Sequence, residues 1–143
     1  MTNQRPIARR WVARSAAALW ALLIAALLLV PLPPEQEDYL PGWLARLIVP
    51  GFDKVVHGAL FFGFAYFLLG ALDTGRWRKP LAFLVAVAYG ALTEWLQPRI
   101  SGRSGEWNDL LADAAGALAG VVTVWAIEIA KKRSRERSAR LSA

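Results

Sequence analysis

Four long apolar stretches alternate with short charged segments along the chain. They cover residues 15–34, 55–72, 80–93 and 110–127, and the third reaches residue 98 if one glutamate is tolerated inside it. Each stretch approaches the roughly 20 residues that an α-helix needs to cross about 30 Å of hydrocarbon. The pattern therefore predicts an all-α polytopic membrane protein with four transmembrane helices.

The connection between the first two stretches, "PLPPEQEDYLPGWLARLIVPGF", is long and rich in proline, which interrupts helices. Within it, residues 42–49 ("GWLARLIV") have the length and amphipathic character of a short interfacial helix. The first stretch ends in "LLLVPLPPE", which lacks the small-residue cleavage pattern of a signal peptide. We therefore expect an uncleaved first span.

Lysine and arginine are distributed unevenly between the connections. Four precede the first span, three lie between the second and third, and six follow the fourth. The other side has only four, namely Arg46, Lys54, Arg99 and Arg103. Because positively charged loops stay in the cytoplasm, we expect both termini to be cytoplasmic. The chain then divides into a cytoplasmic basic segment, a four-helix membrane domain and a cytoplasmic basic tail, at residues 1–14, 15–130 and 131–143.

Charge and composition narrow the partners and the chemistry. We assign the net charge of +6 to contact with anionic lipid headgroups rather than to nucleic acid. The tail "KKRSRERSAR" has no apolar face, which predicts a solvated, disordered anchor. The sequence has no cysteine, no serine nucleophile motif and no phosphate-binding glycine loop. We expect no cofactor, and one histidine among carboxylates is too weak a signature to predict a metal site.

Three ionisable residues fall at one depth in three different helices. His57, Glu94 and Asp113 each lie one turn, about 6 Å, below the predicted outer ends of their helices. Each charged group within the hydrocarbon costs roughly 2.5–3.5 kcal/mol unless it faces protein or water. We therefore expect these side chains to point inward and to form one polar layer, above a close-packing surface that includes Gly116 and Gly120.

Other polar residues near this layer have two interpretations each. Asp53 and Asp109 stand where helix N-caps are expected, and Asp53 is also placed one turn before His57, where it could orient the imidazole. Lys54 either extends to lipid headgroups or contacts a ligand. We predict a ligand-binding set of Asp53, Lys54, His57, Glu94, Gln97, Arg103, Asp109 and Asp113, and catalytic candidates His57, Glu94 and Asp53.

Three segments together resemble the VanZ-like family of small bacterial membrane proteins. The segments are "DKVVHGALFFGFAYFLLG", "YGALTEWLQ" and "GRSGEWNDLLADAAGALAG", within residues 53–120. They match a family pattern of approximately D-K-x-x-H, then E-x-x-Q, then an arginine followed by D-x-x-x-N-x-x-G. This chain has Asp113 where the pattern commonly has asparagine, which favours hydrogen bonding or metal coordination there. The family's name comes from a protein associated with resistance to the glycopeptide teicoplanin, which implies a place in the cell envelope.

The resemblance and the topology together imply a multi-pass protein of the bacterial cytoplasmic (inner) membrane. Our first hypothesis is an outer-leaflet pocket that binds an anionic lipid-linked or glycan-bearing headgroup, such as an envelope precursor, and affects glycopeptide susceptibility. The alternative is an acid-base or metal-assisted hydrolase or transferase acting on such a lipid. A proton-coupled transporter is disfavoured because the polar residues stop at one depth.

Overall fold

The computed structural model describes residues 7–30, 51–72, 75–101 and 105–142. These residues form helices and no strand, which confirms the predicted all-α class. The helices are α1 (Ile7–Leu29), α3 (Phe52–Ala71), α4 (Arg78–Ile100) and α5 (Trp107–Leu141). The predicted interfacial helix at residues 42–49 lies outside the described residues.

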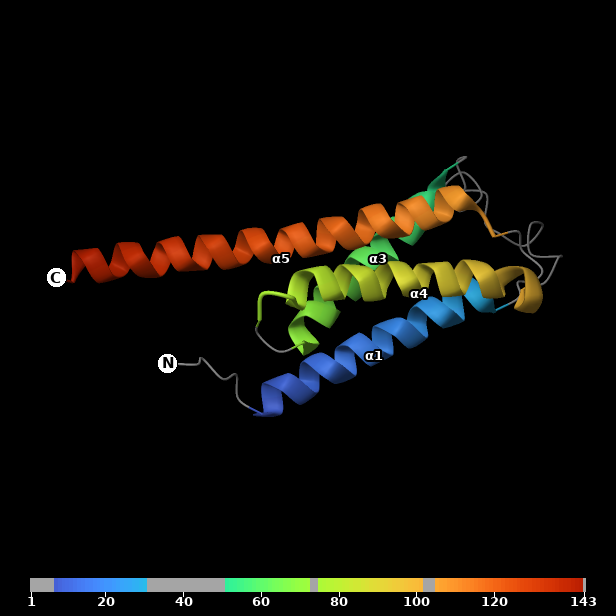
Figure 1. Cartoon of the computed structure of the whole chain (residues 1–143). Helices are drawn as coiled ribbons and strands as arrows, with labels where there is room; N and C mark the ends of the chain where they lie inside the picture. Colours follow the sequence, from blue (N-terminus) through green and yellow to red (C-terminus); the bar gives the residue numbers. More distant parts are fainter. Residues whose placement is uncertain (1–6, 31–50, 73–74, 102–104, 143) are drawn as a thin grey trace, which may run out of the picture.

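All four described helices are long and apolar enough to cross a membrane, so the chain is a multi-pass membrane protein. The chain runs back and forth through the bundle, and successive helices point in opposite directions (Figure 1). One end of the bundle, here called the His57 end, contains the starts of α3 and α5 and the ends of α1 and α4. The opposite end, here called the Arg78 end, contains the start of α4.

All four described helices begin before the apolar stretches that predicted them. Helix α1 begins at Ile7, inside the segment that we assigned to the basic N-terminus. Helix α4 begins at Arg78, which puts Pro80 in its first turn, where a missing N–H breaks no intrahelical hydrogen bond. Hydropathy marks only the lipid-facing part of a helix, whereas the backbone hydrogen bonds continue into polar residues.

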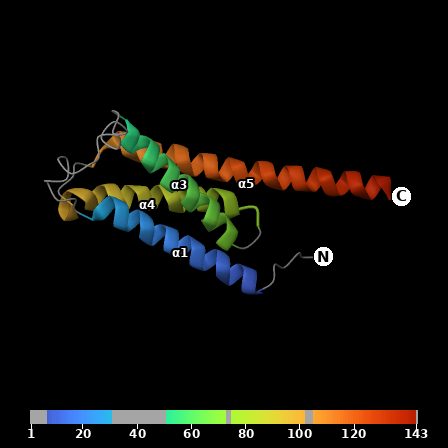
Figure 2. The same ribbon diagram turned by 180° about the vertical axis from the view of Figure 1, so that it is seen from behind.

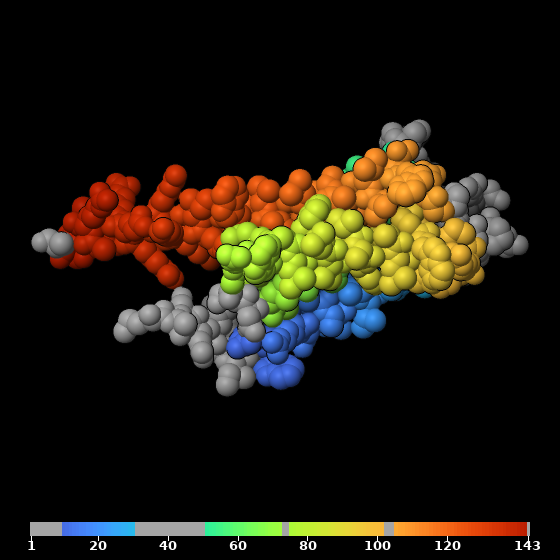
Figure 3. Space-filling view, viewed as in Figure 1, coloured from blue at the N-terminus to red at the C-terminus, as the bar shows by residue number. Residues whose placement is uncertain are grey.

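The predicted disorder of the basic tail is wrong, because α5 continues unbroken to Leu141. A helix that is already nucleated adds a hydrogen bond with each further residue, and lysine, arginine and glutamate are good helix formers. Lys132 and Glu136 lie one turn apart, with Nζ and Oε1 separated by 3.9 Å. The tail is solvated as expected, since its side chains are exposed, and it projects beyond the other helices (Figure 3).

Helices α3 and α5 make the most extensive contact in the bundle, and α3 crosses α5 obliquely (Figure 2). Glycines permit this approach, as the sequence predicted. A Cβ added to Gly120 would lie 2.6 Å from the carbonyl oxygen of Phe62, and one added to Gly116 would overlap the backbone of Gly58. The polar residues of α3 and α5 are thereby brought close together at the His57 end.

Helix α1 packs against this core through apolar side chains and two hydrogen bonds. Trp20 Nε1 donates to the carbonyl oxygen of Leu60 at 2.7 Å, and Tyr89 Oη donates to that of Ala21 at 2.7 Å. These bonds connect α1 to α3 and α4 without any residue of the polar layer. Helix α1 therefore supports the site but does not contribute to it.

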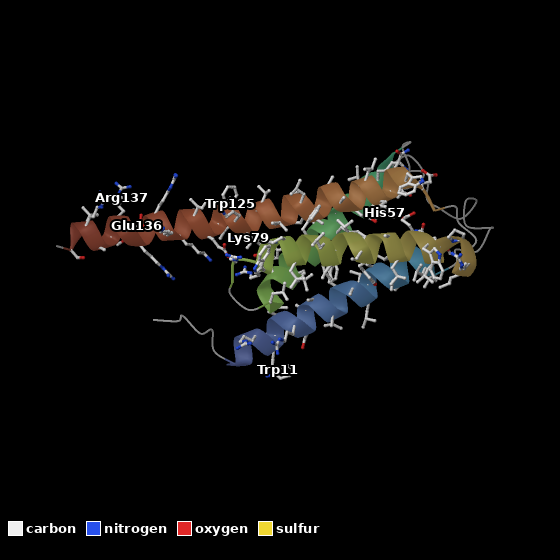
Figure 4. All side chains as sticks on the ribbon, viewed as in Figure 1. Trp11, His57, Lys79, Trp125, Glu136 and Arg137 are labelled. Carbon is white, nitrogen blue, oxygen red and sulfur yellow. The ribbon has the colours of Figure 1, made fainter. Side chains whose placement is uncertain are left out.

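At the Arg78 end, α4 and α5 are joined by ion pairs. Arg78 Nη2 donates to Glu128 Oε1 at 3.0 Å, and Lys79 Nζ lies 2.7 Å from Glu128 Oε2. The Arg78 side chain is buried, so its charge needs this partner. Lys79 is labelled in Figure 4, well away from His57.

Candidate functional site: a buried histidine with two carboxylates

The structure brings together the three residues of the predicted polar layer. His57 from α3, Glu94 from α4 and Asp113 from α5 offer ligand atoms that all lie within 4.8 Å of one another. The distance from His57 Nδ1 to Asp113 Oδ1 is 2.9 Å, and that from His57 Nδ1 to Glu94 Oε1 is 3.8 Å. Figure 4 places His57 near the end where α3 and α5 begin. The expected proximity is confirmed, and we call these residues the buried triad.

The triad is almost completely shielded from the surroundings. His57 is 1% exposed, Asp113 is 0% exposed and the Glu94 side chain is 10% exposed. With Asp113 ionised, His57 Nδ1 is the donor in their hydrogen bond. One polar atom of each residue is buried without a hydrogen-bond partner among the described residues, namely His57 Nε2, Glu94 Oε1 and Asp113 Oδ2. Such atoms are costly to bury and indicate unused binding capacity.

Two glycines allow the carboxylates to approach. A Cβ added to Gly90, one turn before Glu94, would lie 2.8 Å from Asp113 Oδ2. A Cβ added to Gly105 would lie 2.5 Å from the carbonyl oxygen of Glu94. Gly105 and Glu106 therefore pack directly against α4, and the backbone N–H of Glu106 donates to Glu94 Oε2 at 2.9 Å. This bond fixes one oxygen of Glu94 and leaves the other near His57.

A second polar cluster surrounds Lys54 at the same end. Its Nζ lies 2.6 Å from Asp53 Oδ2, 2.9 Å from Asp109 Oδ1 and 3.2 Å from Glu106 Oε2. The contact with Asp109, whose side chain is 7% exposed, is the most buried of the three ion pairs. We call these four residues the Lys54 cluster. Sequence reasoning missed Glu106, whose only signal was its position a few residues before the fourth apolar stretch.

Two expectations about the aspartates are wrong. The N-cap residues are Gly51 for α3 and Glu106 for α5, and neither forms a side-chain cap hydrogen bond. Asp53 and Asp109 lie within the first turns instead. Asp53 pairs with Lys54, and the carboxylate that orients His57 comes from Asp113 on a different helix. Spacing along one helix suggested Asp53, but contact between helices decided the partner.

Gln97 and Arg103 are the remaining residues of the predicted ligand-binding set. Gln97 is 1% exposed, on the same buried side of α4 as Gly90. Thr93, which sequence reasoning did not select, is equally buried, and its hydroxyl donates to the carbonyl oxygen of Gly90 at 2.8 Å. That bond gives Thr93 a structural role. Arg103 lies outside the described residues.

A cavity of about 390 Å³ opens between α4, α5 and the loop that joins them. Glu94 belongs both to its wall and to the buried triad. Two exposed tryptophans and an arginine also line it, Trp95, Trp107 and Arg99, and the Arg99 guanidinium stacks 3.9 Å from the Trp95 ring centroid. Nothing in the residue pattern indicated that these side chains would share a cavity with Glu94.

The arrangement supports two kinds of chemistry. Asp113 holds the His57 imidazole by a hydrogen bond, and Glu94 lies between His57 and the cavity. This arrangement suits hydrogen bonding or proton exchange with a polar group in that cavity. The same three side chains, and separately Asp53, Glu106 and Asp109, are also close enough within each set to hold a cation. Lys54 already lies among the carboxylates of the second set, whereas the first set contains no lysine.

Comparisons with known proteins assign the chain to a family without assigning a ligand. A family model described as VanZ/LLP1 matches residues 17–128, which include the buried triad and the Lys54 cluster. Searches of curated proteins and of solved structures find no significant match.

Proposed function

Because the chain belongs to the VanZ/LLP1 family of membrane proteins, we propose that it binds the polar headgroup of a lipid-linked or glycan-bearing molecule of the bacterial cell envelope. The observation that carries this proposal is that Glu94 belongs both to the cavity wall and to the buried triad. A headgroup in the cavity can therefore form hydrogen bonds with the polar atoms of this site, which apolar lipid tails cannot do. An effect on glycopeptide susceptibility would follow if that molecule is a cell-wall precursor.

The proposed location is the outer leaflet of the cytoplasmic (inner) membrane, with both termini in the cytoplasm. The basis is the excess of lysine and arginine at the Arg78 end, to which the tail of α5 adds its charge. This orientation puts the His57 end and its cavity on the extracytoplasmic side. Exposed Trp95 and Trp107 at that end fit the headgroup level, where amphipathic rings are favoured.

The contacts that we propose for an anionic headgroup differ from those expected from sequence. Lys54 is already surrounded by three carboxylates, so its charge is compensated within the protein. Arg99 lies on the cavity wall and is the better candidate for a phosphate contact, because guanidinium binds phosphate in a bidentate geometry. Glu94 would accept hydrogen bonds from hydroxyl or amino groups, and Arg103 remains a second predicted phosphate contact.

Binding can be tested with the full-length protein in phosphatidylcholine nanodiscs with and without a polyprenyl phosphate. Native mass spectrometry would measure the bound fraction. We expect Arg99→Ala and Glu94→Gln each to weaken binding by about 1–3 kcal/mol, since each removes one polar partner. Glu136→Gln on the tail is the matched control and should bind like the wild type. Equal binding by all four proteins would contradict the proposal.

A second candidate is an acid-base hydrolase or transferase acting on the same headgroup. The hydrogen bond from His57 Nδ1 to Asp113 favours it, because this arrangement holds an imidazole in one orientation and leaves Nε2 able to exchange a proton. His57→Gln preserves volume but cannot exchange a proton near neutral pH. An enzyme should then lose about 10²–10⁴-fold in rate, whereas a binding site should lose only about 1–3 kcal/mol of affinity.

Glycopeptide sensitivity of cells at matched protein abundance would separate the two candidates. Complete loss of the wild-type phenotype in His57→Gln and Glu94→Gln supports catalysis. Partial loss in both, together with loss in Arg99→Ala and Arg103→Ala, supports binding, and this is the result that we expect.

A further inference from the structure

The two acidic clusters at the His57 end differ in one respect. In the Lys54 cluster, the ammonium group of Lys54 already occupies the position between the carboxylates. In the buried triad, the ion pairs of Glu94 and Asp113 within the described part of the chain go only to His57. Two carboxylates therefore share one imidazole, and their side chains are 0% exposed in Asp113 and 10% exposed in Glu94.

The spacing of the triad fits a small divalent cation. Zinc binds imidazole nitrogen and carboxylate oxygen at about 2.0–2.2 Å, so neighbouring ligand atoms around it are roughly 3.0–3.6 Å apart. The observed distances from His57 Nδ1 are 2.9 Å to Asp113 Oδ1 and 3.8 Å to Glu94 Oε1, on either side of this range. The ligand atoms of all three residues lie within 4.8 Å of one another, so small side-chain movements would bring them onto one ion.

Independent support comes from Glu94 Oε1, the proposed ligand atom that is buried without a hydrogen-bond partner among the described residues. His57 and Asp113 are more than nine-tenths buried, and His57 Nε2, Asp113 Oδ2 and Glu94 Oε1 have no hydrogen-bond partner among the described residues. Buried carboxylates without full compensation destabilise a fold unless a cation or a set of donors offsets them. Glu94 Oε1 is at once an atom without a hydrogen-bond partner and the carboxylate oxygen that lies 3.8 Å from His57 Nδ1.

We propose that His57, Glu94 and Asp113 together bind one divalent transition-metal ion, with zinc as the ion to test first. One imidazole and two carboxylates suit zinc better than calcium or magnesium, which take oxygen ligands alone. Three protein ligands leave a coordination position for water or a ligand group, and Glu94 places that position next to the cavity. Binding through Nδ1 breaks the His57–Asp113 hydrogen bond: an imidazolium releases its Nδ1 proton to solvent, whereas in a neutral ring the proton moves from Nδ1 to Nε2, so the ligand is a neutral imidazole in both cases.

This site does not depend on the proposed headgroup function. The full-length protein, purified in detergent and stripped with EDTA, would be equilibrated with zinc, and bound zinc per chain would be measured by mass spectrometry. We expect one ion per chain in the wild type and in the tail control Glu136→Gln. Glu94→Gln and Asp113→Asn should each lower the affinity by at least about tenfold.

A spectroscopic measurement on the wild type avoids the possibility that variants misfold. Cobalt(II) in a four- or five-coordinate protein site absorbs visible light more strongly than the hexaaqua ion, and zinc should abolish this absorption by displacement. Absence of the absorption, zinc binding unchanged in both triad variants, or loss only in Asp53→Asn of the Lys54 cluster would each overturn the proposal. Headgroup binding repeated in EDTA would show separately whether the headgroup function holds.

Discussion

Asp113 is a fully buried carboxylate in a segment that faces hydrocarbon on its other sides. One oxygen accepts a hydrogen bond from His57, and the other has no partner within the described residues. The charge of this side chain and its hydrogen-bonding capacity therefore have opposite effects on stability. Burial of the charge lowers stability, whereas the hydrogen bond with the His57 imidazole raises it.

Two substitutions at this position should separate the effects. In metal-free protein, Asp113→Asn retains a hydrogen-bond acceptor and removes the buried charge, so we expect stability equal to or above that of the wild type. Asp113→Ala leaves His57 without its partner and should cost about 1–3 kcal/mol. Thermal unfolding in detergent with EDTA would measure the order, and an Asn variant less stable than the Ala variant would contradict this view of the site.

At the scale of helices, the site depends on the close contact between α3 and α5. Gly116 lies one turn after Asp113 on α5, and Gly58 lies next to His57 on α3. A Cβ added to Gly116 would overlap the backbone of Gly58. Backbone atoms cannot move aside as a flexible side chain can. The spacing of the triad is thus set by glycines that are not part of it.

We expect Gly116→Ala to separate α3 from α5 and to destabilise the protein by about 1–3 kcal/mol, as is typical of overpacking. Gly75→Ala is the matched control, because a Cβ there meets nothing within 4 Å. Unfolding of both variants in a graded series of SDS concentrations would provide the comparison. Equal stability of the two would show that the contact between α3 and α5 is looser than the structure indicates.

The extent to which the sequence predicted this architecture differs from element to element. Hydropathy predicted the four spans, and helical periodicity put His57, Glu94 and Asp113 at one depth, because both depend on local spacing. The predicted polar layer included the partner that His57 has, Asp113, but the alternative role of Asp53 in orienting the imidazole was wrong, since Asp53 is near in sequence and pairs with Lys54. The cavity could not be predicted, because it depends on how the loop before Glu106 packs against α4.

For the whole molecule, orientation in the membrane decides which side the cavity faces. The sequence has no cysteine, so single cysteines can be labelled without background. We expect Ser101→Cys, at the His57 end, to react with an impermeant thiol reagent in cells whose outer envelope has been opened. Gly75→Cys and Ser142→Cys, at the other end, should react only after the cytoplasmic membrane is permeabilised. The inverse pattern would move the cavity to the cytoplasmic leaflet.

The headgroup that we propose for the cavity beside Glu94 can be captured by photo-crosslinking in living cells. A photoreactive amino acid in place of Leu110, which lines the cavity, would be compared with one in place of Leu118, which is 52% exposed on the same helix. We expect position 110 to capture a molecule with a phosphate-linked or glycan-bearing headgroup, which the adduct mass would identify. Position 118 should capture bulk phospholipid. Bulk phospholipid alone at both positions would contradict it.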